Sequence, residues 1–202
     1  MVNNLEVIKP HLIFPNERSF YFIQILKRKK ENPEMTGYSL PVESFYIFST
    51  EQLDRVMPHI IEKCEQNRAR AYIKMNTLDM QSVALETISV LTQEIRKENW
   101  KHISKALNSA CGICGKQNGT EKMYLIDIDS KDENYINEIK SYINNELEPV
   151  DNTEKVKMVV PTRNGVHFLS TGFNMQKFKQ TYPGIDVHAD GITLLYFPEC
   201  CE

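Results

Sequence analysis

The chain has no run of about 18 apolar residues, the length that a membrane-spanning helix needs. Its start, Met1 to Glu6, also lacks the basic stretch followed by an apolar stretch that marks a secretory signal. The cysteines number five, an odd count, and the adjacent Cys200 and Cys201 make a poor disulfide framework. We therefore predict a cytoplasmic protein without a membrane partner.

Positive charge is not in excess in this sequence. Lys and Arg number 24 against 27 Asp and Glu, which gives a net charge of -3 and a pI of about 6.0. This balance excludes a globally basic nucleic-acid coat, so binding to phosphate polymers would need a local patch or bound cations. The absence of internal repeats and low-complexity segments also excludes solenoid and array architectures.

What is present is the composition of an ordinary folded protein. Of the 202 residues, 41% are hydrophobic and 25% are charged. Turn-forming residues gather at 31–37, 111–119 and 148–152. We predict a single mixed α+β domain, with a helix-rich N-terminal lobe at 1–120 and a strand-rich lobe at 121–202 that carries the polar motifs.

Apolar periodicity predicts a long helix after a short strand at 44–48. Ser49 and Gln52 have the spacing of a capping box at its start. Pro58 lies inside the helix and predicts a kink. The apolar stripe of this helix consists of Leu53, Val56, Met57, Ile60, Ile61 and Cys64.

A second helical pattern follows a predicted strand at 70–75 and runs from 79 to about 107, with a break near Asn99. Trp100 and the aromatic residues of the N-terminal segment fall among apolar positions. We therefore predict that they belong to the core and are not platforms for base stacking.

The second lobe alternates strands with helices, and its start has the strand, helix, strand order of a crossover unit. Asp190-Gly191 is a hairpin signal, so a hairpin is predicted between the last two strands. We expect a mixed sheet flanked by helices. The predicted strands lie at 123–129, 156–160, 166–170, 185–187 and 192–197, and the predicted helices at 133–146 and 174–181.

The most informative motif is Asp127-Ile128-Asp129, which ends an apolar strand. Alternation along a strand puts both carboxylates on the same face. Like charges this close repel unless a cation lies between them, and carboxylate oxygens suit Mg²⁺ or Mn²⁺, which commonly hold nucleotide phosphates. A structural interpretation is equally open, in which one aspartate ends the strand and the other caps the next helix.

A second polar motif lies at 161–170, where a small turn precedes a strand. Arg163 and Asn164 lie in this turn, and His167 is at the start of the strand. A guanidinium group and a histidine both suit phosphate, although a hydrogen-bonded structural histidine is the alternative. Because Asp190 is assigned to a turn, Asp186 is the better candidate for a third carboxylate.

These motifs, in this order, resemble the archaeo-eukaryotic primase superfamily, particularly the small primase-polymerase domains of phages and plasmids. The resemblance covers about 70 residues, from Leu125 to Phe197. The turn departs from the family pattern, which often has a serine or an extra glycine before the histidine. The motifs are Asp127-Ile128-Asp129, Asn164-Gly165-Val166-His167 and Ile185-Asp186-Val187.

The resemblance implies a primase-polymerase-like core and a metal-dependent nucleotidyltransferase that acts in DNA replication. Asp127, Asp129 and Asp186 would be the catalytic ligands of Mg²⁺ or Mn²⁺, and His167, with Arg163 and Asn164 in its turn, would bind the nucleotide. The implied partners are nucleoside triphosphates, a DNA or RNA template and a replication helicase.

Two basic segments are candidates for nucleic-acid binding. Lys27, Arg28, Lys29 and Lys30 form one dense cluster, for which a solvated helix end is the alternative. In the second segment, strand alternation puts Arg70, Tyr72 and Lys74 on one face. That face either lines a cleft or is the solvent side of an edge strand.

Cys111 and Cys114 have the spacing of a zinc knuckle, but a zinc site needs about two more ligands. Cys200, Cys201 or His102 could complete it only through the fold, so a glycine-rich loop with two free thiols is preferred.

Two other functions compete with nucleotidyl transfer. A nucleotide-sugar enzyme with a D-x-D metal site shares the first motif but gives no reason for the histidine turn and the third aspartate. A degenerate primase-fold module would bind nucleic acid or a partner without catalysis. Convergence of Asp127, Asp129, Asp186 and His167 within a few ångströms of a common point, as direct metal ligation demands, is the observation that separates an active site from such a module.

Overall fold

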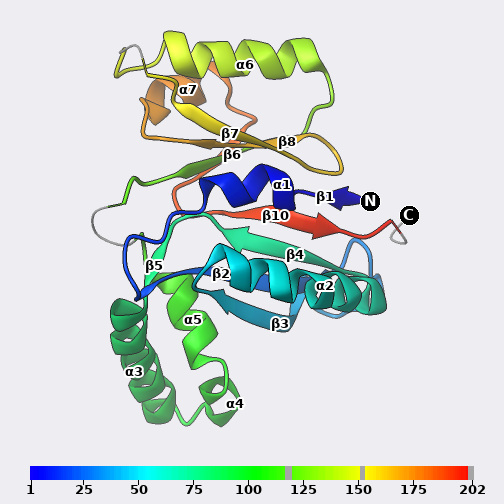
Figure 1. The fold of residues 1–202 in the computed structure, drawn as a ribbon, viewed down its shortest axis with the longest axis vertical. Coiled ribbons are helices and arrows are strands. Elements are labelled where there is room, and N and C mark those ends of the chain that lie inside the picture. Colours follow the sequence, from blue (N-terminus) through cyan, green and yellow to red (C-terminus); the bar gives the residue numbers. More distant parts are fainter. Residues whose placement is uncertain (117–119, 151–152, 200–202) are drawn as a thin grey trace.

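The computed structural model describes residues 1–116, 120–150 and 153–199. Two antiparallel β-sheets lie one above the other in the centre of Figure 1, with helices beyond each of them. The predicted mixed α+β class is confirmed.

The larger sheet has the strand order β1-β10-β4-β2-β3, with β5 paired to β2. The first lobe is richer in helix than in strand, as expected, but its strands β2, β3 and β4 also build most of this sheet, and β10 of the second lobe joins them. Strand β2 is buried along nearly its whole length, so it lacks the alternation that reveals a half-buried strand. The strands are β1 (Val2–Asn3), β2 (Ser19–Arg28), β3 (Ser39–Ile47), β4 (Ala69–Lys74), β5 (Leu78–Asp79) and β10 (Ile192–Phe197).

The smaller sheet has the order β7-β8-β6-β9, and each neighbouring pair is antiparallel, so the expectation of one mixed sheet is wrong. Strands β6 and β7 are therefore parallel to each other with β8 between them, so the predicted crossover is present with a third strand inserted. The strands are β6 (Tyr124–Ile128), β7 (Val156–Pro161), β8 (Val166–Ser170) and β9 (Asp186–His188).

The hairpin predicted between the last two strands is wrong. Strand β9 pairs with β6 in the smaller sheet, whereas β10 pairs with β1 and β4 in the larger sheet. The turn at Asp190 is present, but it carries the chain from one sheet to the other. A turn signal specifies a local change of direction and leaves open which strands pair afterwards.

The helices match the sequence expectations closely. The Ser49 side chain accepts a hydrogen bond from the backbone N–H of Gln52, and α2 continues through Pro58. The helix predicted from 79 is broken as expected, with Asn99 as the N-cap residue of α4. The helices are α1 (Leu5–Ile8), a 3₁₀ turn η1 (Lys9–His11), α2 (Thr50–Asn67), α3 (Met80–Arg96), α4 (Trp100–Ile103), α5 (Ala106–Ile113), α6 (Glu133–Asn145) and α7 (Met175–Thr181).

One hydrophobic cluster joins the two sheets. Leu125 and Val160 of the smaller sheet pack with Ile23 and Ile73 of the larger sheet. The Asn4 side chain donates to the carbonyls of Pro161 and Leu194, each at 2.9 Å, and so also links the sheets. The position of each sheet relative to the other is thus fixed by shared packing.

The prediction for Trp100 is wrong, although the aromatic residues of the N-terminal segment are buried in β2 as expected. The Trp100 side chain is 63% exposed, whereas Phe20 is fully buried. Trp100 lies where α3, α4 and α5 project from the larger sheet as an arm, at the bottom of Figure 1. Apolar periodicity does not reveal that this arm has little protein around it.

Candidate functional site

A polar cleft of about 490 Å³ lies at the junction of the two sheets. It brings together several residues that the sequence singled out, from segments that are far apart in the chain. The smaller sheet and its turns contribute Asp127, Asp129, Arg163, Asn164, His167 and His188, and the segments around β2 and β4 contribute Arg28, Lys30, Arg70 and Tyr72.

Asp127 lies at the centre of a row of polar residues across three strands. In the ladder between β6 and β8 it is directly opposite His167, and in the ladder between β6 and β9 it is directly opposite Asp186. Directly opposed residues of antiparallel strands share one face, with Cβ atoms about 4.5 to 5.5 Å apart. Three of the predicted site residues therefore converge on one face of the smaller sheet.

His167 is held between the two sheets. Its Nε2 lies 3.4 Å from Asp127 Oδ1, and its Nδ1 lies 2.9 Å from Oγ1 of Thr193 in β10. The hydrogen bond from His167 lowers the pKa of Asp127, although partial burial acts in the opposite direction. The ring is thus oriented on both sides, with the Asp127 carboxylate held in its ionised form.

Asp129 and Asp186 are both exposed, and they line a second hollow of about 290 Å³ beside the cleft. Asp127 contributes to both hollows, so the three carboxylates share one continuous surface. Tyr135 and Tyr182 form part of the opposite wall of the second hollow. This surface offers only oxygen ligands from its aspartates, which suits a hard divalent cation.

A preformed metal cluster is not present in the described part of the chain, where no three His, Cys, Asp or Glu side chains gather closely enough to hold an ion. Asp127 directs Oδ1 toward His167, while Asp129 and Asp186 extend into solvent. The donor set fits Mg²⁺ or Mn²⁺ in chemistry, and binding would require the two exposed carboxylates to turn toward Asp127.

Gly165 permits the close approach of the β7–β8 turn to the end of β6. A Cβ atom at this position would lie 2.0 Å from the carbonyl oxygen of Ile128 and 2.7 Å from the backbone nitrogen of Ser130. The turn itself is closed by a hydrogen bond from Thr162 N–H to the Gly165 carbonyl at 2.9 Å. The turn at Gly165 therefore packs against Ile128 and Ser130, the two chain neighbours of Asp129, and so positions Asp129.

The basic wall of the cleft is anchored by aromatic and acidic partners. The Arg70 guanidinium lies 4.6 Å from the centre of the Phe197 ring and forms an ion pair with Glu31, whose side chain is only 1% exposed. The Arg163 guanidinium lies 5.6 Å from the same Phe197 ring. The Arg28 guanidinium lies 6.0 Å from the centre of the Tyr72 ring. These arginines are held at the cleft before any anion binds.

The remaining predicted basic residues are placed differently. Arg28 and Lys30 line the cleft, whereas Lys27 and Lys29 are not among its lining residues. Lys74 is buried, with a side chain only 3% exposed, and pairs with Asp190 at 2.7 Å. Alternation along β4 puts Lys74 two residues beyond Tyr72, but at that point the strand is already covered by α5.

The two cysteines of the zinc hypothesis belong to a helix and its C-terminal end, and not to the predicted loop. Cys111 lies inside α5, and burial raises the pKa of its thiol to about 12. Cys114 is the C-cap residue of α5, and Lys74 donates to the carbonyls of both cysteines. Both thiols are free; Cys200 and Cys201, proposed as further ligands, lie outside the described residues.

Three functional residues were missed by sequence reasoning. Thr193 contacts His167, and Glu31 pairs with Arg70. No local motif around Thr193 or Glu31 indicates these partners. His188 lines the cleft from β9, two residues beyond Asp186, and its spacing in that strand is a signal that could have been used.

Comparison with family models, curated proteins and solved structures gives no match for this chain. In the part of the chain that the structure describes, none of the helices combines the length and the apolar character needed to cross a membrane.

Proposed function

We propose that the protein is a metal-dependent nucleotidyltransferase of the primase or polymerase type, which acts on nucleoside triphosphates with a DNA or RNA template. One observation carries this proposal. His167, Asp127 and Asp129 line one cleft together with Arg28, Arg70 and Arg163, and Asp186 is directly opposite Asp127 in the sheet, so groups that suit a cation and groups that suit phosphate share this surface.

The reaction joins a 3′-hydroxyl oxygen to the α-phosphorus of a nucleoside triphosphate and releases pyrophosphate. Divalent cations, when bound by Asp127, Asp129 and Asp186, would supply charge stabilisation for the attacking and leaving oxygens. His167, Arg163 and Arg70 line the cleft; His167 and Arg163 would contact the triphosphate, and Arg70 would neutralise a backbone phosphate. Little covalent chemistry is then required of the protein itself.

The direct test is nucleotide incorporation by Asp127→Asn combined with Asp129→Asn, measured on a primed template with Mn²⁺. Loss of two metal ligands should reduce incorporation by at least about 10³-fold, since charge stabilisation at a transferring phosphoryl group is the main catalytic contribution. The change keeps side-chain volume, so the variant should still fold, with a melting temperature lowered only by the loss of the contact between His167 and Asp127.

Asp132→Asn is the matched control. Asp132 is an exposed aspartate near the site and is the N-cap residue of α6, a role that asparagine can also fill. This variant should incorporate nucleotide as the unchanged protein does. Equal incorporation by the double variant and the control would refute the assignment of the metal ligands. Binding of a nucleotide sugar without template-dependent incorporation would favour the nucleotide-sugar alternative.

A further inference from the structure

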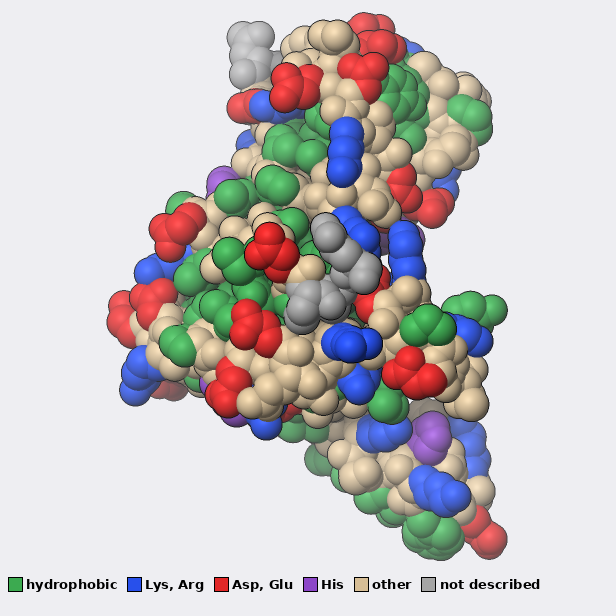
Figure 2. All heavy atoms as spheres, turned by 90° about the vertical axis from the view of Figure 1, so that its right-hand side faces the viewer, with side chains coloured by type: hydrophobic (Ala, Val, Ile, Leu, Met, Phe, Trp, Pro, Cys, Tyr) green, Lys and Arg blue, Asp and Glu red, His purple; other side chains and the backbone are tan. Residues whose placement is uncertain are grey.

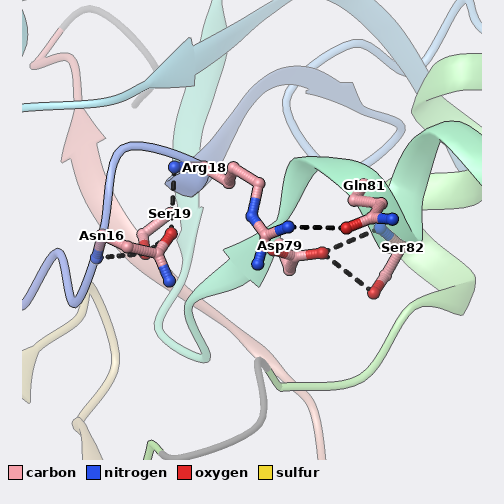
Figure 3. Close-up of polar contacts among 6 residues, drawn as sticks. All are labelled: Asn16, Arg18, Ser19, Asp79, Gln81 and Ser82. Carbon is pink, nitrogen blue, oxygen red and sulfur yellow. Dashed lines mark hydrogen bonds and ion pairs between the residues drawn. The ribbon is translucent and has the colours of Figure 1, made fainter.

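The arm formed by α3, α4 and α5 is fixed at its base. The Asp79 side chain caps α3 by accepting from Ser82 N–H at 2.9 Å. Arg18, from the segment before β2, lies 3.3 Å from Asp79 and donates to Gln81 at 2.6 Å, as Figure 3 shows. The first turn of α3 is thus tied to the body of the molecule, so the arm presents its tip in a defined direction.

The tip of the arm is a tight turn with an aromatic side chain after it. Glu98 adopts φ 55°, and Asn99 N–H donates to the Glu94 carbonyl at 2.9 Å. Trp100 follows directly and is 63% exposed, although a tryptophan side chain is usually mostly buried. The hydrogen-bonded turn therefore sets the backbone from which a large, exposed aromatic ring projects.

The same tip is the most basic short segment of the arm. Residues 96–105 contain four Lys and Arg and one Glu, in a chain whose net charge is -3. Figure 2 shows several Lys and Arg side chains and a histidine on the projecting part at lower right. Local positive charge beside an exposed aromatic ring complements phosphates beside bases. The basic residues of the tip are Arg96, Lys97, Lys101 and Lys105.

A hollow beside the arm lies on the same face of the larger sheet as the cleft. Lys105 and Asn108 line one side of this hollow of about 400 Å³, and Leu40 of β3 lines the other side. Gln24 of β2 also lines this hollow, and alternation along β2 puts Gln24 on the same face as Arg28, which lines the cleft. Glu43 also lines the hollow, but it lies 3.2 Å from His59 in an ion pair.

We propose that the arm tip binds single-stranded nucleic acid, with Trp100 stacked on a base and with Lys101 and Lys105 near the backbone phosphates. This inference rests on the proposed function, since the strand would be template that leaves the cleft along the face of β2 that bears Arg28 and Gln24. A fixed aromatic ring with flanking cations is the arrangement by which proteins hold single strands without reading their sequence.

Trp100 is the one tryptophan of the sequence, so all tryptophan fluorescence reports on the arm tip. Titration with an unlabelled single-stranded oligodeoxythymidylate should quench this fluorescence in a saturable way, because a stacked base quenches the indole. Added salt should weaken the binding. Fluorescence that does not change at saturating oligonucleotide would overturn the proposal.

Variants separate stacking from charge, with binding of a fluorescein-labelled oligonucleotide measured by anisotropy. Trp100→Ala should weaken binding about five-fold or more, and Trp100→Phe should retain most of the affinity. Lys101→Ala and Lys105→Ala should each reduce the slope of log affinity against log salt by about 0.7. Lys179→Ala, an exposed lysine on α7, is the matched control and should change neither quantity. Equal binding by Trp100→Ala and the unchanged protein would contradict the inference.

Failure of this inference can be told apart from failure of the proposed function. The Asp127→Asn, Asp129→Asn variant should lose incorporation and retain fluorescence quenching. Quenching without any incorporation by the unchanged protein would leave the arm as a strand-binding surface and refute the enzyme. Equal quenching by polyglutamate at the same ionic strength would identify a general polyanion surface and overturn the assignment to nucleic acid.

Discussion

At the scale of single residues, the charge state of Asp127 is the central feature. Its carboxylate is partly buried, which by itself favours the neutral acid, but the hydrogen bond from His167 has the larger effect and lowers the pKa. Thr193 fixes the other side of the same ring. The alternation that pairs Asp127 with Asp129 could be predicted from the sequence, whereas the contact with Thr193 could not, because β10 belongs to the other sheet.

This pKa predicts how stability depends on pH. Because the pKa of Asp127 is lower in the folded state than in the unfolded chain, the contact stabilises the fold above the unfolded value of about 3.9. The stabilisation is lost as pH falls from there through the lowered pKa. Asp127→Asn should therefore flatten the acid limb of a plot of unfolding free energy against pH, measured by urea denaturation. His167→Gln should flatten it as well, and an unchanged slope in both variants would contradict the assignment.

At the scale of elements, the β7–β8 turn is built around one glycine. The sequence predicts the turn, because Arg163-Asn164-Gly165 is rich in turn formers. It does not predict that the turn touches the end of β6, where Gly165 leaves no room for a Cβ atom beside Ile128. Only the pairing of β6 with β8 brings these segments together.

Gly165→Ala should destabilise the protein by about 2 kcal/mol or more, because the added methyl group would force two backbone segments apart. Thermal or chemical unfolding measures this loss, and the displacement of Asp129 should lower incorporation in the folded fraction. Gly184→Ala is the control, since a Cβ atom at that position meets no atom within 4 Å. Similar stability losses in the two variants would show that the close approach is not the cause.

At the scale of the whole molecule, a buried lysine links the arm, the larger sheet and the crossing between sheets. Lys74 at the end of β4 donates to the carbonyls of Cys111 and Cys114 and pairs with Asp190 in the turn that precedes β10. Asn76 also donates to Asp190 at 2.9 Å. From the sequence, Lys74 was predicted to bind nucleic acid. That prediction is wrong because strand alternation cannot reveal which helix covers a face.

Lys74→Met should reduce the free energy of unfolding by about 2 to 4 kcal/mol, because it leaves the Asp190 charge without its cation. Combining it with Asp190→Asn should recover part of the loss, since the uncompensated charge is then absent. Urea denaturation of both variants provides the measurement. Lys9→Met, which breaks an exposed ion pair with Asp54, is the comparison and should cost much less. A double variant no more stable than Lys74→Met alone would argue against charge as the cause.

Local sequence specified most of the helices and the polarity of their faces, although it left β2 unrecognised and put the end of α5 in a loop. Capping by Ser49, the stripe of α2 and the alternation at Asp127 and Asp129 depend on neighbours within a few residues, so local chemistry specifies them. Tertiary structure decided which surfaces meet. It put β9 and β10 in different sheets, brought Arg70 and Asp127 into one cleft and left Trp100 in solvent, because these outcomes depend on long-range strand pairing and packing that no local pattern encodes.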